Sequence, residues 1–204
     1  VNLALMFAMS DAKVILVDAD VRKGRVARYF KRRSVPGLSD YLSGQVTLDE
    51  VTHPAAESER LSYITCGTHS PRPYELLESD EMKALIKELK QKYDYIIIDT
   101  PPAGLVADAS IIAQYADANV MVVRRDRSSM RRIRRTIDDM SGTGKEVVGC
   151  IYNDAENDSV LSFIKKNKGG KKGYGYGYGY GYSHEETPSL KSRVKRIWRK
   201  AFNR

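Results

Sequence analysis

Short apolar runs rich in β-branched residues recur along the first 150 residues. Runs of this kind, almost free of polar interruptions, are typical of strands buried on both faces of a parallel sheet. The clear examples are Val14–Ala19, Tyr95–Asp99, Asn119–Arg124 and Val147–Tyr152, and Leu61–Thr65 is a weaker candidate. These segments predict a sheet of four or five buried strands.

Between the predicted strands, apolar residues recur at helical spacing. This spacing predicts helices over Tyr74–Lys92, Ala107–Tyr115 and Ser128–Met140. Strands that alternate with helices form right-handed βαβ units. The sequence therefore predicts an α/β fold with a doubly wound, mainly parallel sheet, in which ligands bind at the carboxyl ends of the strands.

Beyond Asn153 the alternation stops. Residues 165–172 are a Lys/Gly run, and residues 173–182 repeat Gly-Tyr five times. Such low complexity cannot build a packed core, so residues 165–188 are expected to be a flexible tail. Residues 189–204 return to helical spacing, with Trp198 and Phe202 on the apolar side, and predict a basic amphipathic helix. Residues 1–164 are expected to form the globular domain.

The formal net charge of +8 is concentrated in this tail. Residues 165–204 hold 12 Lys/Arg and two Asp/Glu, so the remaining 164 residues carry a net charge of −2. A basic tail suits an anionic lipid surface, a nucleic acid or an acidic partner, and a solvated charge run is the plain alternative. The longest apolar stretch, Leu3–Met9, is far shorter than a membrane span, and two cysteines are too few for a disulfide framework. We expect a cytosolic, reduced chain.

Three aspartates follow two of the predicted strands. Asp18 and Asp20 end the segment VILVDAD, and Asp99 ends YIIID. Carboxylates at the carboxyl edge of a sheet are ligands for a hard cation such as Mg²⁺, with nucleotide phosphates and water completing the shell. The alternative is that each aspartate caps the following helix. Three such residues at two strand ends favour the metal site.

The phosphate-binding loop G-x-x-x-x-G-K-[ST] that such a site requires is absent from the sequence. The nearest match, Gly144-Lys145, has Asp139 at the first glycine position and Glu146 at the Ser/Thr position. The chain instead opens at Val1 in the apolar body of a helix without a cap. We interpret this opening as a helix that is cut at its start.

Several segments together resemble the bacterial tyrosine kinases (BY-kinases), the autokinases of capsule and exopolysaccharide export. They are VNLALMFAMSDAKVILVDADVRKG, PRPYELLESDEM, YDYIIIDTPPAGLVADA and VVGCIYND, followed by a tyrosine cluster. The resemblance implies a P-loop NTPase-like fold, the cofactors ATP and Mg²⁺, and non-specific protein-tyrosine kinase activity. It also implies that the family's Walker A loop and ring-assembly segment lie before Val1, so that this chain is inactive alone.

The resemblance implies a role for each matching residue. Asp18 and Asp20 lie in the Walker A′ motif and Asp99 in Walker B: Asp18 matches the candidate base for the tyrosine hydroxyl, and Asp20 and Asp99 match the ligands of Mg²⁺-bound water. Asn153 matches the asparagine that contacts the nucleotide base, or is only a turn residue. Arg22 is expected to bind the nucleotide phosphates, with a neighbouring subunit or solvent as the alternatives.

Five tyrosines alternate with glycine in the tail and match the family's phosphate acceptors. They are Tyr174, Tyr176, Tyr178, Tyr180 and Tyr182. Period-two spacing places all five on one face of an extended chain. An aromatic strand and a stacking platform for single-stranded nucleic acid are the alternatives.

The resemblance also implies partners and a location. They are a transmembrane polysaccharide co-polymerase (or a missing N-terminal part of the same chain), further copies in a homo-oligomeric ring, a cognate tyrosine phosphatase, and the inner face of the cell membrane, which the basic helix would contact. No nucleic acid is expected. Two other functions stay open: a ParA/MinD-like partition or positioning ATPase, and a non-enzymatic phosphoacceptor.

Overall fold

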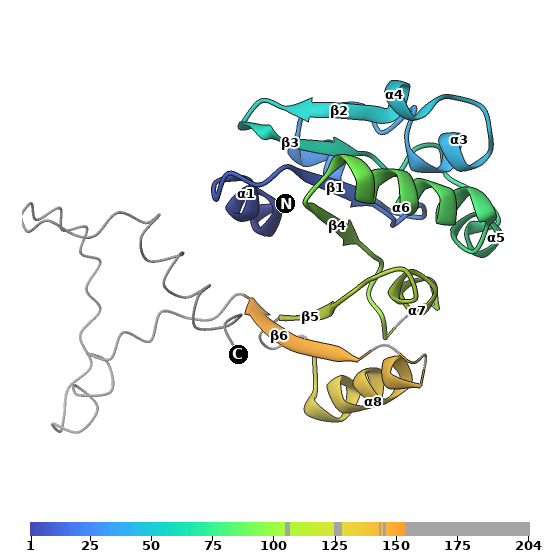
Figure 1. Cartoon of the computed structure of the whole chain (residues 1–204). Helices are drawn as coiled ribbons and strands as arrows, with labels where there is room; N and C mark the ends of the chain where they lie inside the picture. The colour runs from blue at the N-terminus through green and yellow to red at the C-terminus, as the bar shows by residue number, and fades with distance from the viewer. Residues whose placement is uncertain (105–106, 125–127, 143, 145, 154–204) are drawn as a thin grey trace, which may run out of the picture.

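The computed structural model describes residues 1–153 apart from 105–106, 125–127, 143 and 145 (Figure 1). The predicted tail, its tyrosine cluster, the basic helix and the domain boundary at residue 164 all lie outside the described residues. The strands are β1 Val14–Asp18, β2 Thr52–Ala55, β3 Ser58–Ile64, β4 Tyr95–Asp99, β5 Asn119–Arg124 and β6 Val147–Asn153. The helices are α1 Asn2–Ala8, α2 Val26–Tyr29, α3 Leu38–Leu42, α4 Leu48–Val51, α5 Pro73–Leu77, α6 Asp80–Lys92, α7 Asp108–Ala113 and α8 Met130–Ser141.

Four strands form one sheet in the order β2-β3-β1-β4. The central strand β1 runs parallel to both β3 and β4, and β2 pairs with β3 in the antiparallel sense. The predicted α/β class and the mainly parallel sheet are therefore confirmed. The parallel register places the carboxyl ends of β1 and β4 side by side, because Asp18 is paired with Asp99.

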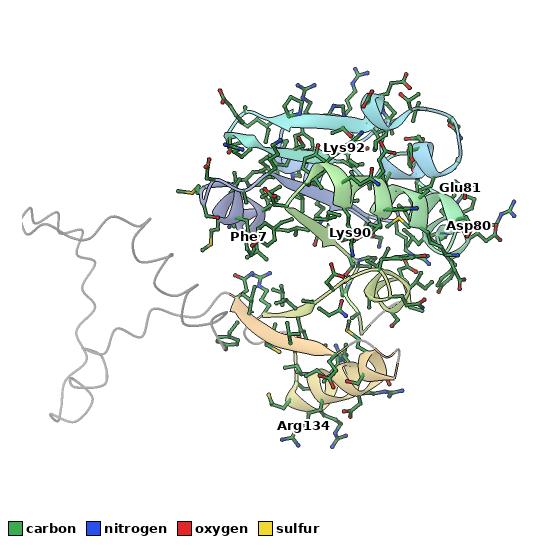
Figure 2. The ribbon with its side chains drawn as sticks, viewed as in Figure 1. Phe7, Asp80, Glu81, Lys90, Lys92 and Arg134 are labelled. Carbon is green, nitrogen blue, oxygen red and sulfur yellow. The ribbon has the colours of Figure 1, made fainter. Side chains whose placement is uncertain are left out.

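Strand β1 is buried on both faces, as its uninterrupted apolar sequence predicts. Ile15 and Val17 belong to a core cluster with α6, whereas Val14 and Leu16 belong to a second cluster with α1. On the α1 side the ring of Phe7 lies 4.5 Å from that of Tyr95 in β4, measured between centroids (Figure 2). Two helical layers thus hold the strand from which the aspartate motif follows.

The helix expected over residues 74–92 is two helices, α5 and α6. The side chain of Ser79 accepts a hydrogen bond from the backbone N–H of Met82 at 3.2 Å and so caps α6. Asp80 and Glu81 follow in the first turn, where negative charge is favourable. The prediction of one helix was wrong because apolar spacing continues across a capping residue that begins a new helix.

The edge strand β2 has no counterpart in the predicted elements. Its sequence, THPA, lacks an apolar run and contains Pro54, a residue that a sheet tolerates at an edge. Its pairing with β3 is irregular between Pro54 and Ala55. The hydrophobic pattern could not reveal a strand that buries so little.

Strands β5 and β6 form a separate parallel pair, flanked on one side by α8 (Figure 1). Among the described strands, nothing pairs with the free edges of β4 and β5. Burial alternates along β5, and Val120, Val122 and Val148 are exposed. The expected single sheet is thus in two parts, because the pattern of apolar residues does not specify which strands are hydrogen-bonded neighbours. No helix in the described part of the chain is long and apolar enough to cross a bilayer.

Candidate nucleotide and metal site

The parallel pairing of β1 and β4 brings the three predicted aspartates to one edge of the sheet. Asp18 lies opposite Asp99 in the register, and the N–H of Ala19 donates to the carbonyl of Asp99 at 2.8 Å. Asp20 follows two residues after Asp18, in the loop that leaves β1. The structure therefore assembles Asp18, Asp20 and Asp99 at the carboxyl ends of adjacent strands, where ligands bind in open α/β sheets.

Asp18 is fully buried, and its carboxylate organises the loop that follows. One oxygen accepts from the N–H of Val26 at 3.0 Å and the other from the N–H of Asp20 at 3.3 Å. Loss of solvent raises the pKa of Asp18 to about 6, and the charge of Asp99 adds to the rise, while the bond from Val26 opposes it. Asp18 is a stronger base than an ordinary aspartate, but the loop encloses it.

The loop over residues 20–24 is closed tightly around these carboxylates. The side chain of Asp20 accepts from the N–H of Lys23 at 2.9 Å and from that of Arg22 at 3.3 Å. A Cβ at Gly24 would lie 2.5 Å from an oxygen of Asp18 and 2.6 Å from the Cβ of Cys66. Only glycine fits there, so Gly24 and Cys66 are part of the site, although the sequence pattern assigned them no role.

Asp99 is exposed at the sheet edge, unlike Asp18. Loss of solvent nevertheless raises the pKa of Asp99, and the charge of Asp20 adds to the rise. The mutual repulsion of three carboxylates is the electrostatic condition in which a bound cation is most stabilising.

The described residues contain no group of three or more His, Cys, Asp or Glu side chains arranged to hold a metal ion by themselves. Magnesium does not need one, because it keeps several waters and is bound in proteins through one or two carboxylates together with substrate phosphates. The partly exposed Asp20 and the exposed Asp99 fit that requirement. They are the residues that would hold Mg²⁺.

Arg22 makes a bidentate ion pair with Asp108, the first residue of α7. Its Nε and Nη2 donate to the two carboxylate oxygens at 2.7 and 3.2 Å, and Asp108 is fully buried. The guanidinium also lies 5.3 Å from the ring centroid of Tyr74 in α5. Arg22 therefore connects the aspartate loop to α7 and α5, which is an arrangement that none of the expectations for Arg22 included.

Asp108 was missed because it lies in a predicted apolar helix. The one available signal was a charged residue in the first turn of a helix, directly after the loop that leaves β4. From the sequence alone, an aspartate in the first turn of a helix is explained equally well by its favourable interaction with the helix dipole, so it does not indicate an ion pair.

Asn153 is not brought to the aspartates. It ends β6, in the separate two-stranded sheet, paired with Arg124. In Figure 1, β4 runs towards α7, whereas β6 ends on the opposite side of the molecule. β6 is hydrogen-bonded to β5, but β5 is not hydrogen-bonded to β4. No strand pairing therefore aligns the end of β6 with the end of β4. A contact between Asn153 and a nucleotide base stays a prediction.

The mainly parallel sheet, with aspartates at adjacent carboxyl ends, is the arrangement expected of a P-loop NTPase-like protein. The family model described as AAA domain matches residues 1–146. The tyrosine-protein kinase ptk of Acinetobacter johnsonii is 37% identical over 158 residues, which are 78% of this chain and 21% of that protein. The tyrosine-protein kinase CpsD of Streptococcus pneumoniae is 35% identical over 156 residues, 75% of this chain and 67% of that protein. The chain belongs to the family of bacterial tyrosine-protein kinases, and it spans about a fifth of the length of the Acinetobacter relative.

Solved structures agree with this assignment. The VpsO kinase domain has a TM-score of 0.72 at 31% identity, covering 76% of each chain. The kinase domain of the Escherichia coli tyrosine kinase ETK has a TM-score of 0.73 at 30% identity, covering 86% of this chain and 64% of its own. The septum site-determining protein MinD of Pyrococcus horikoshii, in complex with Mg-ADP, has a TM-score of 0.62 at 22% identity and covers 78% of this chain and 64% of its own. The likeness to MinD shows the shared fold alone.

Proposed function

We propose that this chain is the core of an ATP-dependent protein-tyrosine autokinase that acts on its own C-terminal tyrosine cluster and regulates capsule or exopolysaccharide polymerisation and export. The observation that carries the proposal is the pairing of Asp18 with Asp99, which gathers three carboxylates at one sheet edge. The 35–37% identity to tyrosine-protein kinases favours this function over a MinD-like one, for which the likeness is 22% identity.

In the proposed reaction, Asp20 and Asp99 would hold Mg²⁺. When bound, the ion would neutralise charge on the transferred phosphoryl group. Asp18 is the candidate base for the tyrosine hydroxyl, and its raised pKa of about 6 suits that role. Because Asp18 is fully buried beneath the loop over residues 20–24, that loop has to move before a tyrosine hydroxyl reaches the carboxylate.

The phosphates of ATP need a cradle of backbone N–H groups that this sequence does not encode. We propose that residues preceding Val1 supply it, and we refer to a protein with both parts as the loop-containing protein. The 204-residue chain alone is then expected not to bind Mg·ATP at micromolar concentrations. Isothermal titration calorimetry on this chain checks the expectation, and a micromolar dissociation constant would contradict it.

The proposed setting follows that of the family. A transmembrane co-polymerase activates the kinase, copies of the chain assemble in a ring at the inner face of the membrane, and a tyrosine phosphatase reverses the modification. The basic segment 189–204 contacts the membrane surface. Its Lys and Arg residues each contribute about 1 kcal/mol near anionic lipid.

The tyrosine cluster provides the direct test of the acceptor site. In the loop-containing protein, replacing Tyr174, Tyr176, Tyr178, Tyr180 and Tyr182 by phenylalanine is expected to remove at least about nine-tenths of the phosphotyrosine, because phenylalanine lacks the accepting oxygen. Mass spectrometry of tryptic peptides measures the change. Tyr29→Phe and Tyr152→Phe, at exposed tyrosines of the described domain, are the controls. Undiminished phosphotyrosine in the five-site variant would place the acceptors elsewhere.

A further inference from the structure

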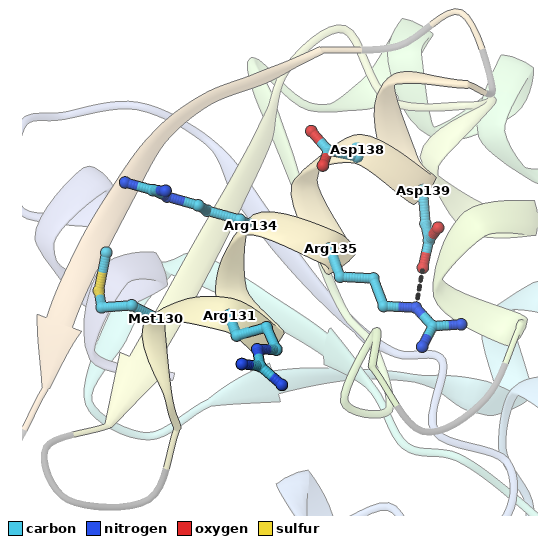
Figure 3. A pocket seen from close by; sticks show the side chains of 6 residues that line it. All are labelled: Met130, Arg131, Arg134, Arg135, Asp138 and Asp139. Carbon is cyan, nitrogen blue, oxygen red and sulfur yellow. Dashed lines mark ion pairs between the residues drawn. The ribbon is translucent and has the colours of Figure 1, made fainter.

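Helix α8 presents an arginine face, defined as Arg131, Arg134 and Arg135. All three side chains are exposed, and together with Met130, Asp138 and Asp139 they line a shallow hollow of about 560 Å³ (Figure 3). Arg134 points away from the rest of the domain (Figure 2). The surrounding sequence is also rich in arginine, because residues 124–135 contain seven arginines, one aspartate and no lysine.

The stability of the helix does not account for these arginines. The acidic residues of α8 lie near its C-terminal end and the arginines near its start, which is the reverse of the order that the helix dipole favours. Arg131 is three residues from Arg134 and four from Arg135, so the arginines repel one another across the helix surface. Among the described contacts of the face, the one ion pair joins Arg135 to Asp139 at 3.9 Å, between side chains that are 84% and 68% exposed. The arginine face costs helix stability, and an anionic ligand would offset that cost.

The chemistry of the face favours phosphate groups. Guanidinium groups bind phosphate through two parallel hydrogen bonds, whereas lysine offers a point charge. Residues three and four apart on a helix have Cβ atoms about 5–6 Å apart. Alternate residues of an extended chain lie about 7 Å apart. These two backbone spacings are similar, and the long arginine and phosphotyrosine side chains can adjust to the remaining difference.

We propose that the arginine face binds the phosphorylated tyrosine cluster of residues 173–182, from the same or a neighbouring copy of this chain. The proposal rests on the proposed function, in which that cluster accepts phosphate. Five phosphotyrosines carry on the order of −8 to −10 charges. Without them, the five lysines of residues 165–172 repel the arginine face, so binding follows phosphorylation. Twenty residues separate Asn153 from Tyr174 and span at most about 70 Å, which allows a chain to reach its own α8.

Binding of a synthetic peptide tests the proposal without any kinase activity. A fluorescent peptide of residues 173–184 with five phosphotyrosines is titrated against the 204-residue chain and followed by anisotropy. The phosphopeptide is expected to bind and the unmodified peptide is not. Arg131→Gln with Arg134→Gln is expected to weaken binding about tenfold or more, as the loss of two charge-assisted contacts implies. Arg131→Lys with Arg134→Lys keeps the charge, loses the paired hydrogen bonds and is expected to give an intermediate affinity.

The matched control is Arg60→Gln with Arg72→Gln. Both arginines are exposed, in β3 and just before α5, and this variant removes the same charge. Equal weakening by the control and the α8 variant, or no binding of the phosphopeptide, overturns the proposal. A third outcome also overturns it. If the chain binds phosphatidylserine vesicles through Arg131 and Arg134 but does not bind the phosphopeptide, the arginine face is a membrane-binding surface. Because the peptide is already phosphorylated, failure of autophosphorylation leaves this result unaffected, and failure of peptide binding leaves the kinase assignment unaffected.

Discussion

At the scale of single residues, Asp18 combines burial with charge. Its carboxylate has no exposed surface, two backbone hydrogen bonds and two acidic neighbours. The pKa of about 6 in the folded chain exceeds the ordinary value of 3.8. A protein with such a group loses stability when the group ionises, and this loss is the cost of placing a potential base beneath the loop.

The dependence of stability on pH follows from that shift. The contribution of Asp18 is fully present below its unfolded pKa, near pH 4, and is lost as pH rises through about 6. Two pKa units correspond to about 3 kcal/mol. The difference in the free energy of unfolding between Asp18→Asn and the unsubstituted chain is therefore expected to change by about 3 kcal/mol, in favour of the variant, as pH rises from 4 to 7. Urea unfolding of both proteins at pH 4, 5, 6 and 7 measures this difference, and parallel pH profiles would contradict the assignment.

At the scale of elements, the break between α5 and α6 shows how one side chain divides a helix. The hydroxyl of Ser79 satisfies the N–H of Met82, so Ser79→Ala is expected to lower the free energy of unfolding by about 1 kcal/mol. Ser79→Asp retains an acceptor at the cap and is expected to restore most of the loss. Chemical denaturation of the three proteins at pH 7 measures both changes. Equal stability of the serine and alanine forms would mean that another contact begins α6.

The sequence was most informative where burial is complete. The apolar run of β1 predicted a strand covered on both faces, and the parallel pairing of β1 with β4 gathered the three aspartates as expected. The sequence was least informative where pairing or charge decides the structure. β2 buries little, the separation of β4 from β5 depends on neighbours that periodicity does not specify, and Asp108 became recognisable only through its ion pair with Arg22.

At the scale of the whole molecule, two charged regions are separated along the fold. The carboxylates lie at the carboxyl ends of β1 and β4, and the arginine face lies on α8, beside the other sheet (Figure 1). Under the proposed function, the first region holds a cation and carries out phosphoryl transfer, and under the further proposal the second binds the anionic product. Moving the phosphorylated tail from one region to the other would clear the site for the next tyrosine.

Tail phosphorylation in an Asp99→Asn variant of the loop-containing protein tests the central claim most directly. The substitution keeps the shape of an exposed side chain at the end of β4 and removes the charge that would help to hold Mg²⁺. Asp117→Asn, at an exposed aspartate that pairs with Lys90, is the matched control. We expect the initial rate of phosphotyrosine formation to fall at least about a hundredfold in Asp99→Asn, since a catalytic metal contributes several kcal/mol, and to remain normal in Asp117→Asn. A normal rate in Asp99→Asn would contradict the assignment of this sheet edge as the site of phosphoryl transfer.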